Sequence, residues 1–297
     1  MVKIKPEQFH KIWSALITPT CKDENVNYEA LERIVELQIQ EGVEGFYCCG
    51  SSGEGLLLTL DERKQVLEHI LKAVNGRVPV ISHVGTIRTK DVIDLAQHAM
   101  SAGALAVSMI PPYYYKFSMD EIIGYYEDVI CALPDVPAIV YNIPQFTGVE
   151  FNKDNAGRLL ANENIVGIKH TSNNLYSLER MSQAFPDKVL INGFDEQFLG
   201  ALSMGSCATI GTTVNLFAPL FHKVRDAFRC GDMALAYHWQ HAINLRVEAT
   251  VKVGIFNAMK YGWTLKGVDC GFCRAPFRPL DEAAQKAIAD LMAIPLE

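Results

Sequence analysis

The chain has 297 residues and a mass of 33.0 kDa, with 49% hydrophobic and 21% charged residues. These fractions are typical of a globular chain and exclude a disordered or collagen-like protein. Its 34 acidic and 27 basic residues give a formal charge of -7 without any block of five like charges, so we expect no binding to nucleic acid or to an anionic membrane. Apolar stretches such as 104–112 are too short to span a membrane, and residues 1–13 lack a signal-type apolar segment. We therefore expect a soluble, cytoplasmic protein.

The length is compatible with one large α/β barrel or with two ordinary domains. Short apolar runs rich in β-branched residues recur along the chain, with helix-period segments between them. Such continuous runs are typical of parallel strands that helices cover on both faces. Eight runs are predicted as strands: 12–17, 45–49, 78–84, 104–110, 138–143, 165–170, 189–192 and 208–210.

Helix signals lie between these runs. Thr59 and Glu62 form a capping box at the start of a helix over 60–74, and Ser118 and Glu121 repeat the box before a helix over 121–131. Further signals are Asn27 before a helix over 28–40 that stops at Gly42, Gly76 after the helix over 60–74, and Pro219 in the first turn of a helix that ends before Gly231. After Gly231 the strand pattern ends, and helices are predicted over 233–249, 251–261 and 281–293.

Eight strand-then-helix units in about 230 residues match a (β/α)8 TIM barrel better than an open doubly wound sheet with a separate domain. The predicted organisation is a barrel over residues 1–231 that carries the active site, and a C-terminal helical extension over 232–297 that packs on it. In such a barrel the reactive groups come from the carboxyl ends of the strands and the loops that follow them.

The cysteines predict no metal centre. Cys270 and Cys273 form a lone CxxC without the second ligand pair that a structural zinc site needs. Other cysteines lie inside apolar runs, where we expect buried free thiols: Cys48, Cys49, Cys131 and Cys207.

The second predicted strand ends in a loop that could bind an anion. Ser51 and Ser52 lie between Gly50 and Gly53, so backbone N–H groups and two hydroxyls can point at one ligand. The loop lacks a lysine of the kind that binds nucleoside triphosphates, so a carboxylate suits it better. The alternative is an ordinary glycine-serine turn without a ligand.

A single lysine, Lys169, interrupts the sixth predicted strand near its carboxyl end. Because a buried ammonium is costly, either the side chain reaches solvent or the pKa of its amine falls. A pKa lowered by about 3 units would give the free amine that attacks a ketone. Lys169 is therefore a candidate Schiff-base nucleophile, whereas His170 faces the opposite side of the strand and is predicted to have a packing role.

Polar residues also follow the neighbouring strands. Tyr141 ends the fifth predicted strand, about 4.8 Å from the sixth if the two are adjacent, and could relay protons to an adduct on Lys169. The alternative is a core tyrosine with a bonded hydroxyl. Asp195 and Glu196 follow the seventh strand, where they either cap a helix or accept hydrogen bonds from a ligand.

Together these motifs resemble the pyruvate-dependent class I aldolases, the family of dihydrodipicolinate synthase and N-acetylneuraminate lyase. The resemblance spans nearly the whole chain, through GSSGE, PPYYYKFS, YNIP, GIKHTS, NGFDE, IGTT and GVDCGFCRAPF in order. It implies that Lys169 forms the Schiff base, that Tyr141 relays protons, and that Ser51 and Ser52 bind the pyruvate carboxylate. It also implies that Thr171 lies near the reacting carbons.

The resemblance further implies a homotetramer in which Tyr114, within the run 113–115, reaches a neighbouring subunit's site. Small molecules, namely sialic acid, pyruvate and N-acetylmannosamine, are the expected partners. Neither a metal nor another cofactor is expected, because the iminium formed on the lysine already supplies the electrophile.

Residues that meet the second substrate indicate the branch of the family. Dihydrodipicolinate synthases typically carry an arginine after YNIP, whereas this chain has no cation over 145–148. The NGFDE segment instead resembles sialic acid lyases, which implies reversible cleavage of N-acetylneuraminate to N-acetylmannosamine and pyruvate. The implied ligands of the polyol tail are Gly193, Asp195, Glu196, Gly211 and Thr212.

Two departures from the family pattern concern specificity more than chemistry: Ser52 replaces a commoner threonine, and Thr212 a serine found in some relatives. The enzymatic alternative is another aldolase of this family, acting on a 2-keto-3-deoxy sugar acid or on aspartate semialdehyde. A catalytically silent barrel that senses a keto acid or sugar is a further alternative. It is disfavoured because a pure binder has no need of a buried amine.

Overall fold

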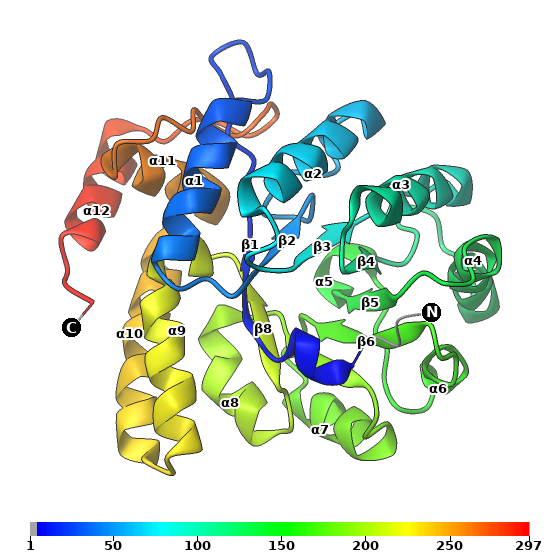
Figure 1. Cartoon of the computed structure of the whole chain (residues 1–297). Coiled ribbons are helices and arrows are strands. Elements are labelled where there is room, and N and C mark those ends of the chain that lie inside the picture. The colour runs from blue at the N-terminus through cyan, green and yellow to red at the C-terminus, as the bar shows by residue number, and fades with distance from the viewer. Residues whose placement is uncertain (1–4, 297) are drawn as a thin grey trace. The chain divides into compact units, whose positions relative to one another are not determined.

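The structure, a computed structural model, describes residues 5–296. Its strands form a closed barrel in chain order, and the residue registers along it are parallel (Figure 1). The strands are β1 (Ile12–Ala15), β2 (Gly45–Cys48), β3 (Val80–His83), β4 (Ala106–Met109), β5 (Ala138–Asn142), β6 (Ile165–His170), β7 (Val189–Asn192) and β8 (Ala208–Gly211).

Each of the eight predicted runs contains one of these strands, which confirms the predicted TIM barrel. The strands are buried on both faces, as the continuous apolar runs indicate. Several are shorter than their runs, because apolar residues continue beyond the ladder. Leu16 and Ile17, for example, stay buried after β1 has ended, and the Ile17 N–H donates to the side chain of Asn215.

Helices alternate with the strands along the chain. They are η1 (Pro6–Phe9), α1 (Tyr28–Gln40), α2 (Leu60–Val74), α3 (Thr89–Ala102), α4 (Met119–Ala132), α5 (Pro144–Thr147), α6 (Gly157–Leu160), α7 (Leu175–Ala184), η2 (Asp195–Gln197), α8 (Phe198–Ser203), α9 (Val214–Arg229), α10 (Met233–Val253), α11 (Ile255–Leu265) and α12 (Glu282–Met292).

The predicted helix N-caps are confirmed. The side chain of Asn27 accepts a hydrogen bond from the Ala30 N–H at the start of α1. Both capping boxes form, at Thr59 before α2 and at Ser118 before α4. Each box satisfies two of the backbone N–H groups that a helix start leaves without partners.

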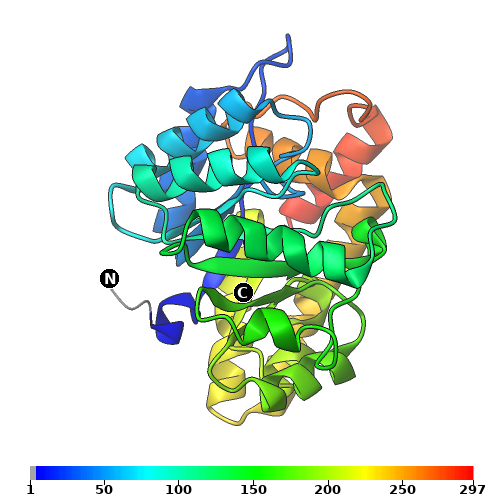
Figure 2. The same ribbon diagram turned by 90° about the vertical axis from the view of Figure 1, so that its right-hand side faces the viewer.

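The chain forms two compact units. Residues 5–11 and 81–210 make up the first, and residues 12–80 and 211–296 the second. Within the second unit α9 lies beside α10, and α11 and α12, orange and red in Figure 2, pack against each other. The division of the chain at residue 231 into a barrel and an extension stays a prediction.

Several helix boundaries differ from the sequence expectation. Helix α4 starts at Met119 instead of 121, and α11 covers Ile255–Leu265 instead of 251–261. Helix α9 starts at Val214, but the non-helical backbone of Phe217 divides it, so a second helical segment starts next to Pro219, where the missing proline N–H costs nothing. Helix α10 continues to Val253 and ends at Gly254, whose φ of +99° only glycine adopts easily.

One buried side chain joins three of these elements within the second unit. The Asn215 amide nitrogen donates to the carbonyls of Ala15 and Thr212, both at 2.8 Å. Its oxygen accepts from the Ile17 N–H and from the Gln38 side chain, both at 3.3 Å. The end of β1, the helix α1 and the start of α9 are therefore held by a single amide.

The cysteines are free thiols. Of the four predicted to be buried, Cys48 and Cys49 are buried and Cys207 is only partly buried. Cys131 is the exception and is exposed, because the apolar face of α4 consists of residues such as Val129 and Ile130 and Cys131 falls on the other face. Burial raises the pKa of both Cys270 and Cys273 to about 12, so these thiols stay protonated at neutral pH. Within residues 5–296, no helix is long and apolar enough to cross a membrane.

A bidentate ion pair joins α2 to the segment that follows α11. The Arg274 guanidinium donates to both carboxylate oxygens of Glu62, and it also donates to the carbonyls of Glu24 and Leu57. The hydrogen bonds from Arg274, together with those from Thr59, lower the pKa of Glu62 to about 2.

We expect Glu62→Gln to lower the melting temperature at pH 7 by about 2–4 °C, which corresponds to about 1 kcal/mol. Glutamine preserves the capping box, so the change isolates the ion pair. Because the folded-state pKa lies below the usual 4.5, the stabilisation is present above pH 4.5 and is lost as the pH falls towards 2. The difference in melting temperature between the two proteins should therefore shrink over this range.

Glu248→Gln, at an exposed position of α10, is the matched control and should show a small difference at every pH. A Glu62→Gln difference that stayed constant from pH 7 to pH 3 would contradict the assignment of the effect to this carboxylate.

Candidate active site

The predicted nucleophile is buried, and it lies against the predicted proton relay. Lys169 and Tyr141 are register partners on β6 and β5. The Lys169 side chain packs across the tyrosine ring, with Nζ 3.8 Å from the ring centroid. Both residues are buried, at 4% and 3% exposure, so the alternative of a lysine that reaches solvent is wrong.

The neighbouring residues on the same two strands hold them in register. Asn142 receives a hydrogen bond on its side-chain oxygen from the Phe151 N–H, and its side-chain nitrogen lies 3.0 Å from His170 Nδ1. His170 Nε2 lies 3.1 Å from the Asn174 carbonyl oxygen. Since side chains alternate along a strand, this network lies on the face of the sheet opposite to Lys169 and Tyr141.

Burial lowers the pKa of His170, so its ring is neutral at neutral pH. A neutral ring can accept the Asn142 amide on Nδ1 while Nε2–H donates to the Asn174 carbonyl. This agrees with the packing role that alternation predicts for His170.

Thr171 follows Lys169 by two residues and therefore returns to the same face. It is 4% exposed, and among the described residues its hydroxyl has no hydrogen-bond partner. Gly193, after β7, leaves room for this hydroxyl, because a Cβ at position 193 would lie 1.8 Å from Thr171 Oγ1. The structure thus leaves a buried hydroxyl available two residues beyond the amine.

The acidic pair after β7 starts the short helix η2. Asp195 is buried and Glu196 is half-buried, and burial raises the pKa of Glu196. The Asn192 side chain fixes the turn before them by donating to the Phe194 carbonyl at 2.7 Å and to the Thr209 hydroxyl at 3.1 Å. Asp195 and Glu196 are therefore held on a short, well-braced turn.

In the second unit, the loop after β2 brings two of the predicted residues together. Ser52 Oγ lies 2.7 Å from the Thr212 hydroxyl, and Ser51 is half-buried beside it in sequence. The Thr18 hydroxyl donates to the Gly53 carbonyl at 2.8 Å. The family resemblance assigns Thr212 to binding of the polyol tail. In the structure its hydroxyl contacts Ser52, one of the two residues predicted to bind the carboxylate, and the sequence did not reveal this contact.

Tyr114 lies in the loop between β4 and α4. It is 86% exposed, and its ring packs edge-on against Tyr115 at a centroid distance of 5.1 Å. Its φ of +77° is a strained conformation for an aromatic residue.

Sequence reasoning did not single out His83, which ends β3. Its buried ring meets the Tyr141 ring edge-on, with centroids 6.0 Å apart and an interplanar angle of 88°. The available signal was its position at the carboxyl end of a predicted strand, where a barrel carries its reactive groups.

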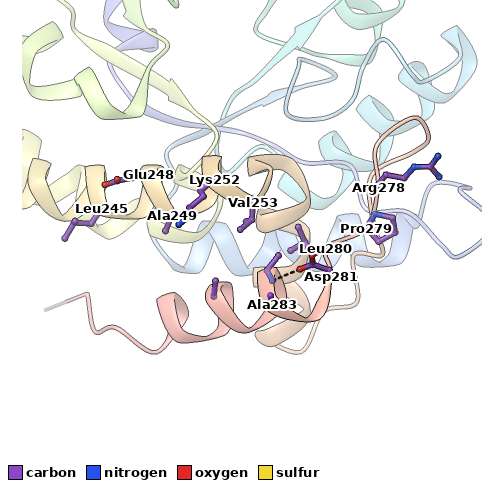
Figure 3. Close-up of a pocket in the computed structure, with 12 residues that line it drawn as sticks. Leu245, Glu248, Ala249, Lys252, Val253, Arg278, Pro279, Leu280, Asp281 and Ala283 are labelled. Atoms are coloured by element: carbon purple, nitrogen blue, oxygen red, sulfur yellow. Dashed lines mark hydrogen bonds between the residues drawn. The ribbon is translucent and has the colours of Figure 1, made fainter.

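Two surface cavities contain none of the predicted site residues. One, of about 860 Å³, lies between α10 and the segment that leads into α12, with Lys252 and Leu280 among its walls (Figure 3). The other, of about 710 Å³, involves Pro6 and Lys188. Among residues 5–296, no group of three or more His, Cys, Asp or Glu side chains is placed to hold a metal ion.

Comparisons with known proteins show the family of this chain. The model of the dihydrodipicolinate synthetase family matches residues 8–294. The N-acetylneuraminate lyase of Rhizobium meliloti (strain 1021) is 39% identical over 95% of this chain and 94% of its own length.

Solved structures are similar as well. CdNal from Clostridium difficile, crystallised in complex with mannosamine, has a TM-score of 0.93 and 32% identity, over 95% of this chain and 97% of its own. A catalytic lysine mutant of the Ruminococcus gnavus sialic acid aldolase has a TM-score of 0.93 and 27% identity, over 96% of this chain and 95% of its own.

We expect Gly193→Ala to destabilise the protein by about 1–3 kcal/mol, because its Cβ would overlap the Thr171 side chain within a packed region. Thermal unfolding measures the effect. The matched control is Gly124→Ala in α4, where a Cβ meets no atom within 4 Å, so alanine should leave stability unchanged or raise it. Equal melting temperatures for both variants would refute the crowding at position 193.

Proposed function

This chain belongs to the dihydrodipicolinate synthetase family, and we propose that it catalyses the reversible aldol cleavage of N-acetylneuraminate to N-acetylmannosamine and pyruvate. The observation that carries the proposal is the buried amine of Lys169 on the ring of Tyr141. The names of the similar proteins support the choice of substrate.

The reaction begins when the unprotonated Nζ of Lys169 attacks C2 of the open-chain keto acid. The ketone oxygen leaves as water, and the nitrogen becomes a positively charged iminium. This group draws electrons from the C3–C4 bond, so cleavage leaves an enamine in place of an unstabilised carbanion. The cationic iminium then lies where the electron-rich face of the Tyr141 ring can stabilise it.

Cleavage also requires that the proton of the C4 hydroxyl be removed. The Tyr141 hydroxyl takes that role, acting together with the substrate's own carboxylate, and the proton later returns to C3 of the enamine. The Thr171 hydroxyl orients the C4 hydroxyl, which agrees with its burial without a hydrogen-bond partner among the described residues. Water then releases pyruvate and regenerates the lysine amine.

The carboxylate of the keto acid is bound by Ser51 and Ser52. In a closed parallel barrel the loops that follow the strands carry the active site, and these serines follow β2. The 2.7 Å contact between Ser52 and Thr212 gives the Ser52 hydroxyl a partner that orients it. Hydroxyls and loop N–H groups suit a carboxylate because each can donate a hydrogen bond to it.

The polyol tail of the sugar acid is bound by Gly193, Asp195, Glu196, Gly211 and Thr212. Sugar hydroxyls donate readily to carboxylate oxygens, and the braced turn at η2 supplies two such groups. A raised pKa for Glu196 is compatible with a partly dehydrated site that takes up a neutral, hydrogen-bonding ligand.

A second copy of this chain is the proposed macromolecular partner, in a homotetramer. The exposure of Tyr114 supports this, because a large aromatic side chain in a strained backbone conformation gains contacts only if another surface covers it. The cytoplasmic location stays a prediction.

Within the family, the absence of an arginine over 145–148 favours the sugar acid over aspartate semialdehyde. The purified protein is expected to release pyruvate from N-acetylneuraminate. It should neither release pyruvate from 2-keto-3-deoxygluconate nor consume pyruvate with aspartate semialdehyde at a comparable kcat/KM. A higher kcat/KM for either of these alternatives would replace the proposed substrate but leave the Schiff-base chemistry in place.

The nucleophile is tested by incubation with pyruvate and borohydride, followed by peptide mapping. The wild-type chain should gain a reduced pyruvate adduct on Lys169, whereas Lys169→Arg should gain none, because a guanidinium does not form an imine. An adduct on the arginine variant would refute the assignment of Lys169. The absence of an adduct on the wild type would revive a non-catalytic keto-acid receptor.

Tyr141→Phe separates the proton relay from Schiff-base formation. It keeps the ring beneath the Lys169 amine but removes the hydroxyl. We expect kcat for cleavage to fall by about 10²–10⁴-fold, while the variant still forms the reducible pyruvate adduct. A variant with unchanged kcat would show that another group moves the proton.

A further inference from the structure

A buried ion pair lies beside the serine loop, and the mechanism above does not use it. Glu54 Oε1 and Lys260 Nζ are 2.6 Å apart, and their side chains are only 2% and 1% exposed. Glu54 lies in the loop that follows β2, and Lys260 lies in α11.

Both members of the pair make further hydrogen bonds within the second unit. Lys260 Nζ donates to the Phe272 carbonyl at 2.9 Å and to the Thr20 hydroxyl at 3.3 Å. Glu54 Oε2 accepts the Arg274 N–H at 2.7 Å. The loop after β2 is therefore attached through Glu54 both to α11 and to the segment that follows it.

Stability alone is a poor reason for this arrangement. The attraction between two buried charges barely offsets the free energy lost when both leave water. Apolar residues of similar size often give a protein equal or greater stability. Glu54 also has a φ of +54°, a left-handed conformation that costs a residue other than glycine about 1 kcal/mol or more. The pair thus holds the backbone in a conformation that it would not otherwise prefer.

This strained backbone is directly joined to the serines. The Glu54 N–H donates to the Ser51 carbonyl at 3.1 Å, and the next N–H, of Gly55, donates to the Gly50 carbonyl at 3.0 Å. A shift of Glu54 would therefore move Ser51 and the Ser52 hydroxyl that contacts Thr212.

We propose that Glu54 and Lys260 are a positioning pair, which fixes the loop over residues 50–55 so that Ser51 and Ser52 meet the substrate carboxylate. The role of the serines in this inference rests on the proposed function. The attachment of the loop by the ion pair is a separate property that does not depend on that function. Neither member of the pair touches the reacting atoms. Both act through the serines.

The test uses Glu54→Gln, Lys260→Met and the double variant in the full-length chain. Glutamine keeps an acceptor for the backbone N–H of Arg274, and methionine occupies the space of the lysine methylene groups without a charge. The double variant removes both charges, so that it folds even if either single variant leaves an uncompensated charge. The control is Glu44→Gln, which weakens an ion pair with Arg225 at 2.7 Å in the same unit but away from the loop.

The first readout is the pyruvate concentration that half-saturates borohydride trapping, together with KM and kcat for cleavage. We expect half-saturation and KM to rise about tenfold or more in the double variant, while kcat changes less than about threefold, because a misplaced carboxylate site weakens binding more than chemistry. Glu44→Gln should leave both values unchanged even though it lowers the melting temperature. Unchanged KM and half-saturation in the double variant would overturn the proposal.

The second readout is independent of activity. Hydrogen exchange of a peptide covering residues 49–58 should accelerate at least tenfold in the double variant and stay unchanged in Glu44→Gln. Wild-type protection of this peptide in the double variant would refute the claim that the pair fixes the loop, whatever the effect on catalysis. If the wild type traps no pyruvate but hydrogen exchange still accelerates in the double variant, the proposed function is wrong, whereas the claim that the pair fixes the loop is supported.

Discussion

An amine removed from water is the constraint on which the rest of the molecule depends. A lysine on a buried strand is tolerated only where its charge is stabilised or its proton is lost, and the Tyr141 ring faces Lys169 Nζ at 3.8 Å. The direct pairing of these residues on adjacent parallel strands leaves little freedom to either. The hydrogen bonds of Asn142 and His170, on the other face of the same strands, keep this register without adding charge near the amine.

Most of the fold could be predicted from local patterns. Continuous apolar runs mark strands that are buried on both faces, and the capping boxes at Thr59 and Ser118 mark helix starts through bonds between residues three apart. The strand ends were harder to place, because Leu16 and Ile17 remain buried after the ladder stops. The exposure of Cys131 depends on which face of a helix meets its neighbours, and a single sequence shows this only indirectly.

The candidate site was predictable where strand order and alternation decide the outcome. Lys169 and Tyr141 are neighbours because consecutive strands pair in the barrel, and Thr171 shares their face because side chains alternate. Contacts between distant segments gave no such signal. Three contacts depend on tertiary packing: the edge-on contact of His83 with Tyr141, the Ser52–Thr212 contact and the Glu54–Lys260 pair. In the last case the sequence showed a glycine-serine loop, and Glu54 within the same loop carries the buried charge.

The Asn215 amide bonds to the end of β1, to α1 and to the start of α9. It therefore also affects the resistance of the protein to chemical degradation. Its nitrogen faces the carbonyl oxygens of Ala15 and Thr212. Spontaneous deamidation would turn the donor into a carboxylate oxygen and place a negative charge against two other oxygens, at a residue that is completely buried. That reaction needs the backbone nitrogen of the following residue, Leu216, to attack the side-chain carbonyl carbon. The same bonds that make the damage severe therefore also hold the side chain away from that nitrogen.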